Sequence, residues 1–273
     1  MKSILAAREE IVKYSHRVQQ HGFVSATDGN LSIRLDEERI LITPSGLPKG
    51  DMTLEDPLLI DMEGNKIEGE GKPSSETRMH LEVYRLRSDV HAVIHAHPPK
   101  CIAFTVAGVP LDTCLLPEVV VTIGAVPTSR YATPTTEEVP QSIRDYIKKS
   151  NAVMLARHGS LTVGPDLGTA FKILEKMEHS ASIAIYAKIL GGIQPFTEEE
   201  LKKLYALRSE WGVKSPALAC PLKNLTDRTG AIQSGESASS ACPAGDSEDL
   251  EIDTETLIDV IVERVKERLK EIG

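Results

Sequence analysis

The apolar positions of the chain follow two spacings, which predict helices and short strands in mixed order. Apolar residues three and four apart predict helices over residues 3–21, 74–87, 136–149 and 167–190, with a further helix that begins at Pro99. Short aliphatic and β-branched runs predict strands at 31–34, 40–43, 58–61, 66–68, 90–97, 119–121, 125–127 and 153–158. Because helices and strands do not alternate strictly, we expect an α+β or mixed sheet rather than a doubly wound parallel one.

The pattern changes near residue 220 and divides the chain into three parts. Residues 1–218 carry the predicted helices and strands, whereas residues 219–250 are rich in Ser, Ala, Gly and acidic side chains and predict a flexible linker. Residues 251–273 place apolar side chains at helical spacing, namely Leu257, Ile258, Ile261, Val265 and Leu269. A tethered amphipathic helix is typical of a docking segment. The alternative is a helix that packs on its own domain or on a neighbouring subunit.

Composition and charge narrow the class of protein. The chain has 273 residues, of which 41% are hydrophobic and 26% charged, as in ordinary globular proteins. A formal net charge of −9 argues against nucleic-acid binding, since phosphate backbones require basic surfaces. No apolar run reaches the roughly 18 residues of a membrane span, and no signal peptide precedes the first helix, so we expect a cytoplasmic protein. The four cysteines lack C-x-x-C spacing, and no disulfide framework is expected.

Three histidines stand at the ends of predicted strands and indicate a metal site. His95 and His97 are separated by one residue, so in a strand they point to the same face, about 6–7 Å apart. His158 ends another apolar run. Three imidazoles suit a catalytic zinc ion, which keeps an open position for water or substrate. The alternative is that they are ordinary polar residues at strand ends.

Three stretches of small residues suit an anion such as phosphate, namely 27–30, 43–46 and 72–76. Gly and Asn allow the left-handed conformations that turn N–H groups inward, and Ser74 and Ser75 lie at a predicted helix N-terminus. Glu76 lies in the first turn of that helix. It is either a surface carboxylate that complements the helix dipole or a general base beside the metal. His80, one turn later, either supports Glu76 or covers the helix surface.

Five short motifs in order give a resemblance to a known family: Gly-Asn-Leu-Ser (29–32), Ile-Thr-Pro-Ser-Gly (42–46), Pro-Ser-Ser-Glu (73–76), His-Ala-His-Pro (95–98) and Arg-His-Gly (157–159). Over residues 3–214 the chain resembles the class II aldolase/adducin family, and within it the fuculose-phosphate aldolases. The resemblance implies a three-layer α/β/α sandwich around a largely antiparallel sheet. It also implies a C4 homotetramer with its active site at the subunit interface.

The same resemblance implies roles for single residues. It implies one Zn²⁺ held by His95, His97 and His158, with Glu76 as fourth ligand at rest and catalytic base in turnover. The phosphate of the substrate would be bound by Thr27, Gly29, Asn30, Ser45, Gly46, Ser74 and Ser75. The implied reaction is cleavage of a ketose 1-phosphate, such as L-fuculose 1-phosphate, to dihydroxyacetone phosphate and a small aldehyde such as lactaldehyde.

Other activities of the same family remain alternatives. A methylthioribulose-1-phosphate dehydratase or a sugar-phosphate epimerase would use the same metal and phosphate residues. The epimerases usually have Asp where this chain has Glu76, which favours the aldolase. A non-catalytic scaffold of the adducin type is disfavoured because the three histidines and Glu76 are all present.

The chain departs from the fuculose-phosphate aldolases in two places. The tyrosine that donates a proton to the aldehyde oxygen should lie in residues 118–121, where there is none, and Trp211 stands where a second tyrosine is expected. Tyr131 matches a family position without an obvious role as the acid. The tail also extends past the usual end of the family. It resembles the encapsulation peptides of bacterial microcompartment enzymes, so residues 251–271 would bind a shell protein.

Overall fold

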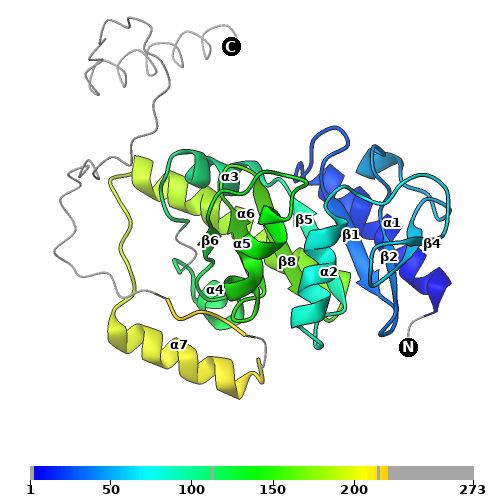
Figure 1. Cartoon of the computed structure of the whole chain (residues 1–273). Helices are drawn as coiled ribbons and strands as arrows, with labels where there is room; N and C mark the ends of the chain where they lie inside the picture. The colour runs from blue at the N-terminus through cyan, green and yellow to red at the C-terminus, as the bar shows by residue number, and fades with distance from the viewer. Residues whose placement is uncertain (1–2, 112–113, 214–215, 221–273) are drawn as a thin grey trace, which may run out of the picture. The chain divides into compact units, whose positions relative to one another are not determined.

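A computed structural model describes residues 3–111, 114–213 and 216–220, and its described part is built around one sheet (Figure 1). The sheet has eight strands in the order β4-β3-β2-β1-β5-β8-β7-β6. Its strands are β1 (Asn30–Arg34), β2 (Arg39–Ile42), β3 (Leu58–Asp61), β4 (Lys66–Glu68), β5 (Ala92–Ala96), β6 (Thr128–Ser129), β7 (Ala152–Leu155) and β8 (Gly159–Gly164). Neighbouring strands are antiparallel except β6 and β7, which are parallel.

Helices cover both faces of the sheet, which makes the three-layer α/β/α sandwich expected from the sequence. The helices are α1 (Ile4–Gln20), α2 (Thr77–Leu86), α3 (Pro99–Val106), α4 (Pro117–Thr122), α5 (Glu138–Ile147), α6 (Leu167–Ile189) and α7 (Glu198–Glu210), with a 3₁₀ turn η1 (Lys49–Asp51). Alternate strand residues face opposite layers. In β5, Val93 belongs to the core under α2 and α5, whereas Ile94 belongs to the core under α1 and α6. Burial of both faces explains the largely apolar strands.

Four elements differ from the prediction. The strand expected at 125–127 is absent: Ala125 forms an isolated bridge to Leu218, and the nearby strand is β6. Residues 119–121 belong to helix α4, not to a strand. Val119, Val120 and Val121 are all buried, and a short continuous apolar run does not distinguish a buried helix from a buried strand. Pro117 at the first turn is the helix-start signal that decides between them. Strand β8 and helix α7 were not expected, although α7 begins at a capping box formed by Thr197 and Glu200.

The expectation of no disulfide is wrong. Cys114 and Cys220 are bonded, with their Cα atoms 5.8 Å apart and a sequence separation of 106. The bond lies in a small apolar cluster with Val120 of α4 and Leu201 of α7. Cysteine spacing could not predict this pair because the fold alone brings the two residues together. Cys101 is a buried free thiol.

The predicted docking helix and almost all of the predicted linker lie in residues 221–273, outside the described residues. The compact unit that contains the sheet extends from Met1 to Leu225. Among the described residues, no helix combines the length and the apolar character needed to cross a membrane.

Candidate metal centre and catalytic site

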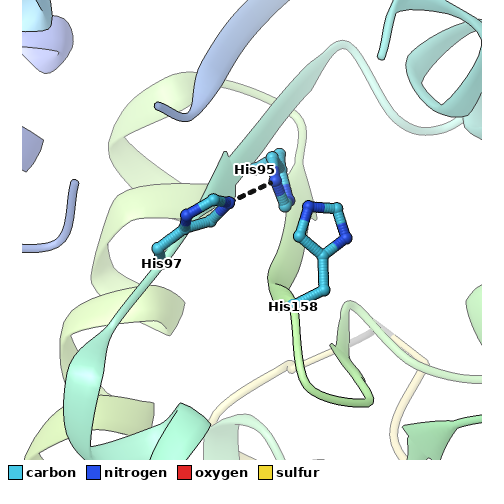
Figure 2. A group of neighbouring side chains, drawn as sticks. All are labelled: His95, His97 and His158. Carbon is cyan, nitrogen blue, oxygen red and sulfur yellow. Dashed lines mark hydrogen bonds between the residues drawn. The ribbon is translucent and has the colours of Figure 1, made fainter. Parts of the chain in front are cut away.

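Three histidines from neighbouring strands meet at one end of the sheet (Figure 2). His95 lies in β5, His97 follows the end of β5, and His158 lies in the turn between β7 and β8. Strand β8 pairs with both β5 and β7, so the turn before β8 lies beside the end of β5. The ring centroids lie between 4.8 and 5.2 Å apart, and one ligand nitrogen from each ring lies within 4.8 Å of the others.

Glu76 reaches this cluster from the helix layer. It is the residue that precedes α2, and its side chain is largely buried. His95 shares the β5 face of Val93, which packs in one cluster with apolar residues of α2, so the strand alternation directs His95 toward the start of α2. Glu76 Oε2 lies 3.0 Å from His95 Nε2, and Oε1 lies 3.2 Å from His158 Nε2. The structure therefore brings together all four residues expected from the sequence.

The arrangement of donors and acceptors fits a divalent cation. His95 Nδ1 donates to the Ser160 carbonyl at 3.0 Å, which assigns the ring proton to Nδ1 and leaves Nε2 as an acceptor. That acceptor lies 3.0 Å from a second acceptor, Glu76 Oε2. Two acceptors at this distance repel each other unless a proton or a cation lies between them. Three imidazoles and one carboxylate form a ligand set that zinc prefers.

Each ring nitrogen of His97 also lies near a polar atom of another residue. Its Nε2 lies 3.0 Å from His95 Nε2, and its Nδ1 lies 3.6 Å from Asp28 Oδ2. Burial, followed by the neighbouring His95 and His158, lowers the pKa of His97 to about 4. A neutral imidazole at pH 7 is the form that binds a metal ion.

A ladder of polar side chains between β1 and α2 fixes Glu76 from behind. Asn30 and Ser32 alternate with buried Leu31 and Ile33, so they share the β1 face that α2 covers. Glu76 at the N-cap of α2 and His80 and Tyr84 within the helix are spaced four residues apart, which places them in one row. The spacing between Asn30 and Ser32 along β1, about 6.6 Å, is close to the rise of about 5.4 Å per turn of α2. The strand residues and the helix residues therefore remain in contact along the ladder.

The donor and the acceptor of each hydrogen bond in this ladder can be assigned. Asn30 Oδ1 can only accept, so His80 Nε2 donates to it at 2.6 Å and His80 Nδ1 accepts from Ser32 Oγ at 2.7 Å. Ser32 Oγ in turn accepts from the Tyr84 hydroxyl at 2.7 Å.

The ladder ends where Asn30 Nδ2 donates to Glu76 Oε2 at 3.0 Å. Burial lowers the pKa of His80 to about 3, so the ring stays neutral at pH 7. A neutral ring is what these hydrogen bonds require, because Nδ1 must accept while Nε2 donates. His80 thus supports Glu76 through Asn30, one of the two roles considered from sequence.

The three stretches expected to bind phosphate are tied to one another beside Glu76. The Ser45 N–H donates to the Lys72 carbonyl at 2.9 Å, and Pro44 bridges to Pro73. The Glu76 N–H donates to Ser74 Oγ at 3.3 Å. These contacts place Ser45, Gly46, Ser74 and Ser75 on adjacent turns.

Lys49 joins the first turn, which holds Thr27, Gly29 and Asn30, to Leu47, directly after the second turn. Gly29 has φ +74°, and a Cβ there would lie 2.5 Å from Val24 Cγ1, so only glycine fits. The Asn30 side chain faces Glu76 and His80. Sequence reasoning missed Ser32, Tyr84 and Lys49; the alternation of polar and apolar residues in β1 was the available signal for Ser32.

Two aromatic residues considered for the aldehyde end are largely exposed. Tyr131 is 59% exposed and Trp211 60%. Among the described residues, the ring contacts of His95, His97 and His158 are with one another and not with Tyr131 or Trp211.

Gly159 allows the histidine cluster to close. A Cβ on this residue would lie 2.6 Å from the Ala96 carbonyl oxygen, 2.8 Å from His97 Cδ2 and 2.9 Å from His95 Cε1. We expect Gly159→Ala to push both rings out of place and to lower zinc affinity at least tenfold, which equilibrium dialysis measures.

The matched control is Gly164→Ala at the other end of β8, where a Cβ would meet Thr169 at 3.1 Å. Both substitutions crowd the strand, so both lower stability, but only Gly159→Ala should weaken zinc binding. Equal zinc affinity in the two variants would show that Gly159 does not shape the site.

The fold and this site define the class of protein. The chain matches the family model of the Class II Aldolase and Adducin N-terminal domain over residues 9–185, and it belongs to the class II aldolase/adducin family. Its homologues are class II aldolases, which are lyases, and the chain is an enzyme of that kind.

Relatives with assigned activities act on phosphorylated compounds according to their names. A 5-deoxy-D-ribulose 1-phosphate aldolase of Bacillus thuringiensis is 33% identical over 72% of this chain and 92% of its own length. A 3-oxo-tetronate 4-phosphate decarboxylase of Haemophilus influenzae is 29% identical over 73% of this chain and 96% of its own length. A solved L-fuculose 1-phosphate aldolase has 31% identity and a TM-score of 0.69, with 76% of this chain and all of that chain covered.

Proposed function

We propose that the protein is a zinc-dependent aldolase that cleaves a ketose 1-phosphate to dihydroxyacetone phosphate and a small aldehyde. The observation that supports this most is the facing pair of acceptors, His95 Nε2 and Glu76 Oε2, within the cluster of three histidines. A zinc ion held there would polarise the ketone oxygen and stabilise the negative charge that develops on it.

Glu76 is the acid and base of the proposed reaction. When the bond between the third and fourth carbons breaks, the three-carbon fragment keeps the electron pair and must be protonated at that carbon. Glu76 would deliver this proton in cleavage and remove it in condensation. The ladder through Asn30 holds Oε2, and Oε1 faces the interior of the site beside His158. The carboxylate is therefore held in one orientation, as an efficient proton transfer requires.

The two ends of the substrate would be bound by different parts of the molecule. The turns at residues 27–30, 43–46 and 72–76, with their small hydroxyl and glycine residues, suit the phosphate end. The aldehyde end would be bound by a neighbouring subunit, as in a homotetramer. Exposed apolar residues on α3, on α6 and directly after α6, which a subunit contact would cover, support this: Val106, Tyr186, Ile189 and Leu190.

Decarboxylation is the second candidate, because one relative carries that activity in its name. Loss of CO₂ from a 3-oxo-tetronate 4-phosphate leaves the same three-carbon fragment, so the chemistry at Glu76 would be the same. Dehydration and epimerisation would instead leave the carbon skeleton intact.

Product analysis separates these activities. The zinc-loaded protein is incubated with L-fuculose 1-phosphate, 5-deoxy-D-ribulose 1-phosphate and 3-oxo-tetronate 4-phosphate. Dihydroxyacetone phosphate is measured by coupled NADH oxidation, the aldehyde by trapping and CO₂ by its release. We expect triose phosphate and aldehyde in equal amounts from a ketose 1-phosphate. If triose phosphate forms only from 3-oxo-tetronate 4-phosphate, together with CO₂, the protein is a decarboxylase. If no substrate yields triose phosphate, both the aldolase and the decarboxylase assignments are contradicted.

For the tail, we propose that residues 251–271 bind a shell protein of a bacterial microcompartment and keep the enzyme in the cytoplasm within that shell. The amphipathic spacing of Leu257, Ile261 and Val265 supports this. Deletion of residues 230–273 should leave catalysis unchanged and release the protein from shell fractions. Unchanged co-purification of the truncated protein with shells would contradict the proposal.

A further inference from the structure

A buried lysine lies behind the turns assigned to the phosphate. Lys49 is fully buried, although lysine is the residue that folded proteins bury least readily. Its ammonium donates to the Thr27 carbonyl at 3.1 Å and to the Leu47 carbonyl at 2.8 Å. These are the only hydrogen bonds of Nζ within the described residues. The side chain therefore joins the 27–30 turn to the segment that follows the 43–46 turn.

A purely structural role does not explain a cation at this position. Burial of a charge costs free energy that two neutral carbonyls offset only in part, and an apolar side chain fills such a space without that cost. Burial lowers the pKa of Lys49 to about 8, while Asp28 opposes the change, so the ammonium is still charged at pH 7.

The surrounding groups need such a charge. The residues assigned to the phosphate are Thr27, Gly29, Asn30, Ser45, Gly46, Ser74 and Ser75, and none of them is charged. The nearby Asp28 is negative and lies beside His97. Lys72, in the 72–76 stretch, is exposed to water, which screens its charge. At the turns themselves, backbone amides and hydroxyls supply partial positive charge to a phosphate dianion, and Lys49 is the buried cation beside them. A cation in a region of low dielectric acts over a longer range than one in water.

We propose that Lys49 is a positioning residue of the phosphate site, whose buried ammonium holds the turns at Thr27 and Leu47 together and supplies positive charge beneath the substrate phosphate. This inference rests on the proposed function insofar as the phosphate binds at these turns. It goes beyond that function because it assigns the charge balance of the site to a residue that does not contact the metal ligands.

The test measures binding of inorganic phosphate to the zinc-loaded full-length protein by isothermal titration calorimetry. Lys49→Met removes the charge at similar volume, and Lys49→Arg keeps it. Lys149→Met removes an equal charge from an exposed position at the end of α5. Unphosphorylated dihydroxyacetone serves as the neutral ligand, and circular dichroism with thermal unfolding checks that each variant is folded.

We expect Lys49→Met to weaken phosphate binding about tenfold and to leave the affinity for dihydroxyacetone and the zinc content unchanged. Lys49→Arg should recover most of the phosphate affinity, and Lys149→Met should bind phosphate as the wild type does. Wild-type phosphate affinity in a folded Lys49→Met variant would overturn the proposal. Equal losses for phosphate and dihydroxyacetone would overturn it as well, because they indicate a general structural role.

The two proposals can fail separately. If the wild-type protein binds phosphate in a Lys49-dependent way but releases no triose phosphate from any substrate, the aldolase assignment fails and the role of Lys49 stands. If the wild-type protein releases triose phosphate and Lys49→Met binds phosphate normally, the aldolase assignment stands and the proposed role of Lys49 fails.

Discussion

Glu76→Gln lowers the rate of carbon–carbon cleavage about 10³-fold, within the range expected when a general acid–base group is removed. Glutamine has the shape of glutamate but cannot accept the proton. The amide oxygen can still accept the hydrogen bond from Asn30 Nδ2, so the ladder behind the residue is kept. Because the three histidines remain, we expect a zinc content close to that of the wild type. Steady-state kinetics and metal analysis of the same preparation measure both quantities.

The matched control for this variant is Glu63→Gln, an exposed carboxylate in the turn between β3 and β4. It makes the same chemical change outside the site and should leave the rate unchanged. A Glu76→Gln variant with zinc bound and more than a tenth of the wild-type rate would rule out Glu76 as the base.

His97→Ala removes one of the three imidazoles and lowers zinc affinity at least 100-fold. Loss of a residue that only hydrogen-bonds to a metal ligand typically lowers metal affinity about 10- to 100-fold, so a larger loss is expected for a ligand itself. His97 is the choice because its side chain is 22% exposed, so its loss leaves no large internal cavity. Activity should fall with the bound metal and should recover in part at high zinc concentration. Competition with a chromophoric chelator measures the affinity.

His91→Ala is the control for this experiment. His91 precedes the same strand as His95 but is exposed at its other end. Zinc affinity equal to the wild type is expected for His91→Ala. If His97→Ala and His91→Ala retain the same zinc affinity, the metal centre is not the cluster described above.

Local patterns predict much of the frame of the site. Two histidines two residues apart in a strand share a face for geometric reasons alone, which is why the His95–His97 pair is visible in the sequence. The apolar run that ends in His158 indicates a strand end in the same way. The layered fold follows from amphipathic helices and apolar strands, and the structure confirms it.

The remaining features depend on how distant segments pair. The ladder behind Glu76 exists because β1 pairs with β5, so that Asn30 lies opposite His95, and because α2 packs across both strands. No local spacing encodes that register. Lys49 lies in a Pro-Lys-Gly-Asp stretch, where a charged residue is normally exposed. Helix α4 was mistaken for a strand because an all-apolar run has no period to distinguish the two.

The most direct test of the account is proton exchange on the three-carbon product alone. Zinc-loaded protein is incubated with dihydroxyacetone phosphate in D₂O, and NMR follows the hydroxymethyl protons next to the ketone. The role given to Glu76 predicts exchange of one of these two protons without any aldehyde present, and no exchange in Glu76→Gln or after zinc removal. Exchange at the wild-type rate in Glu76→Gln, or none in the zinc-loaded wild type, would contradict the account.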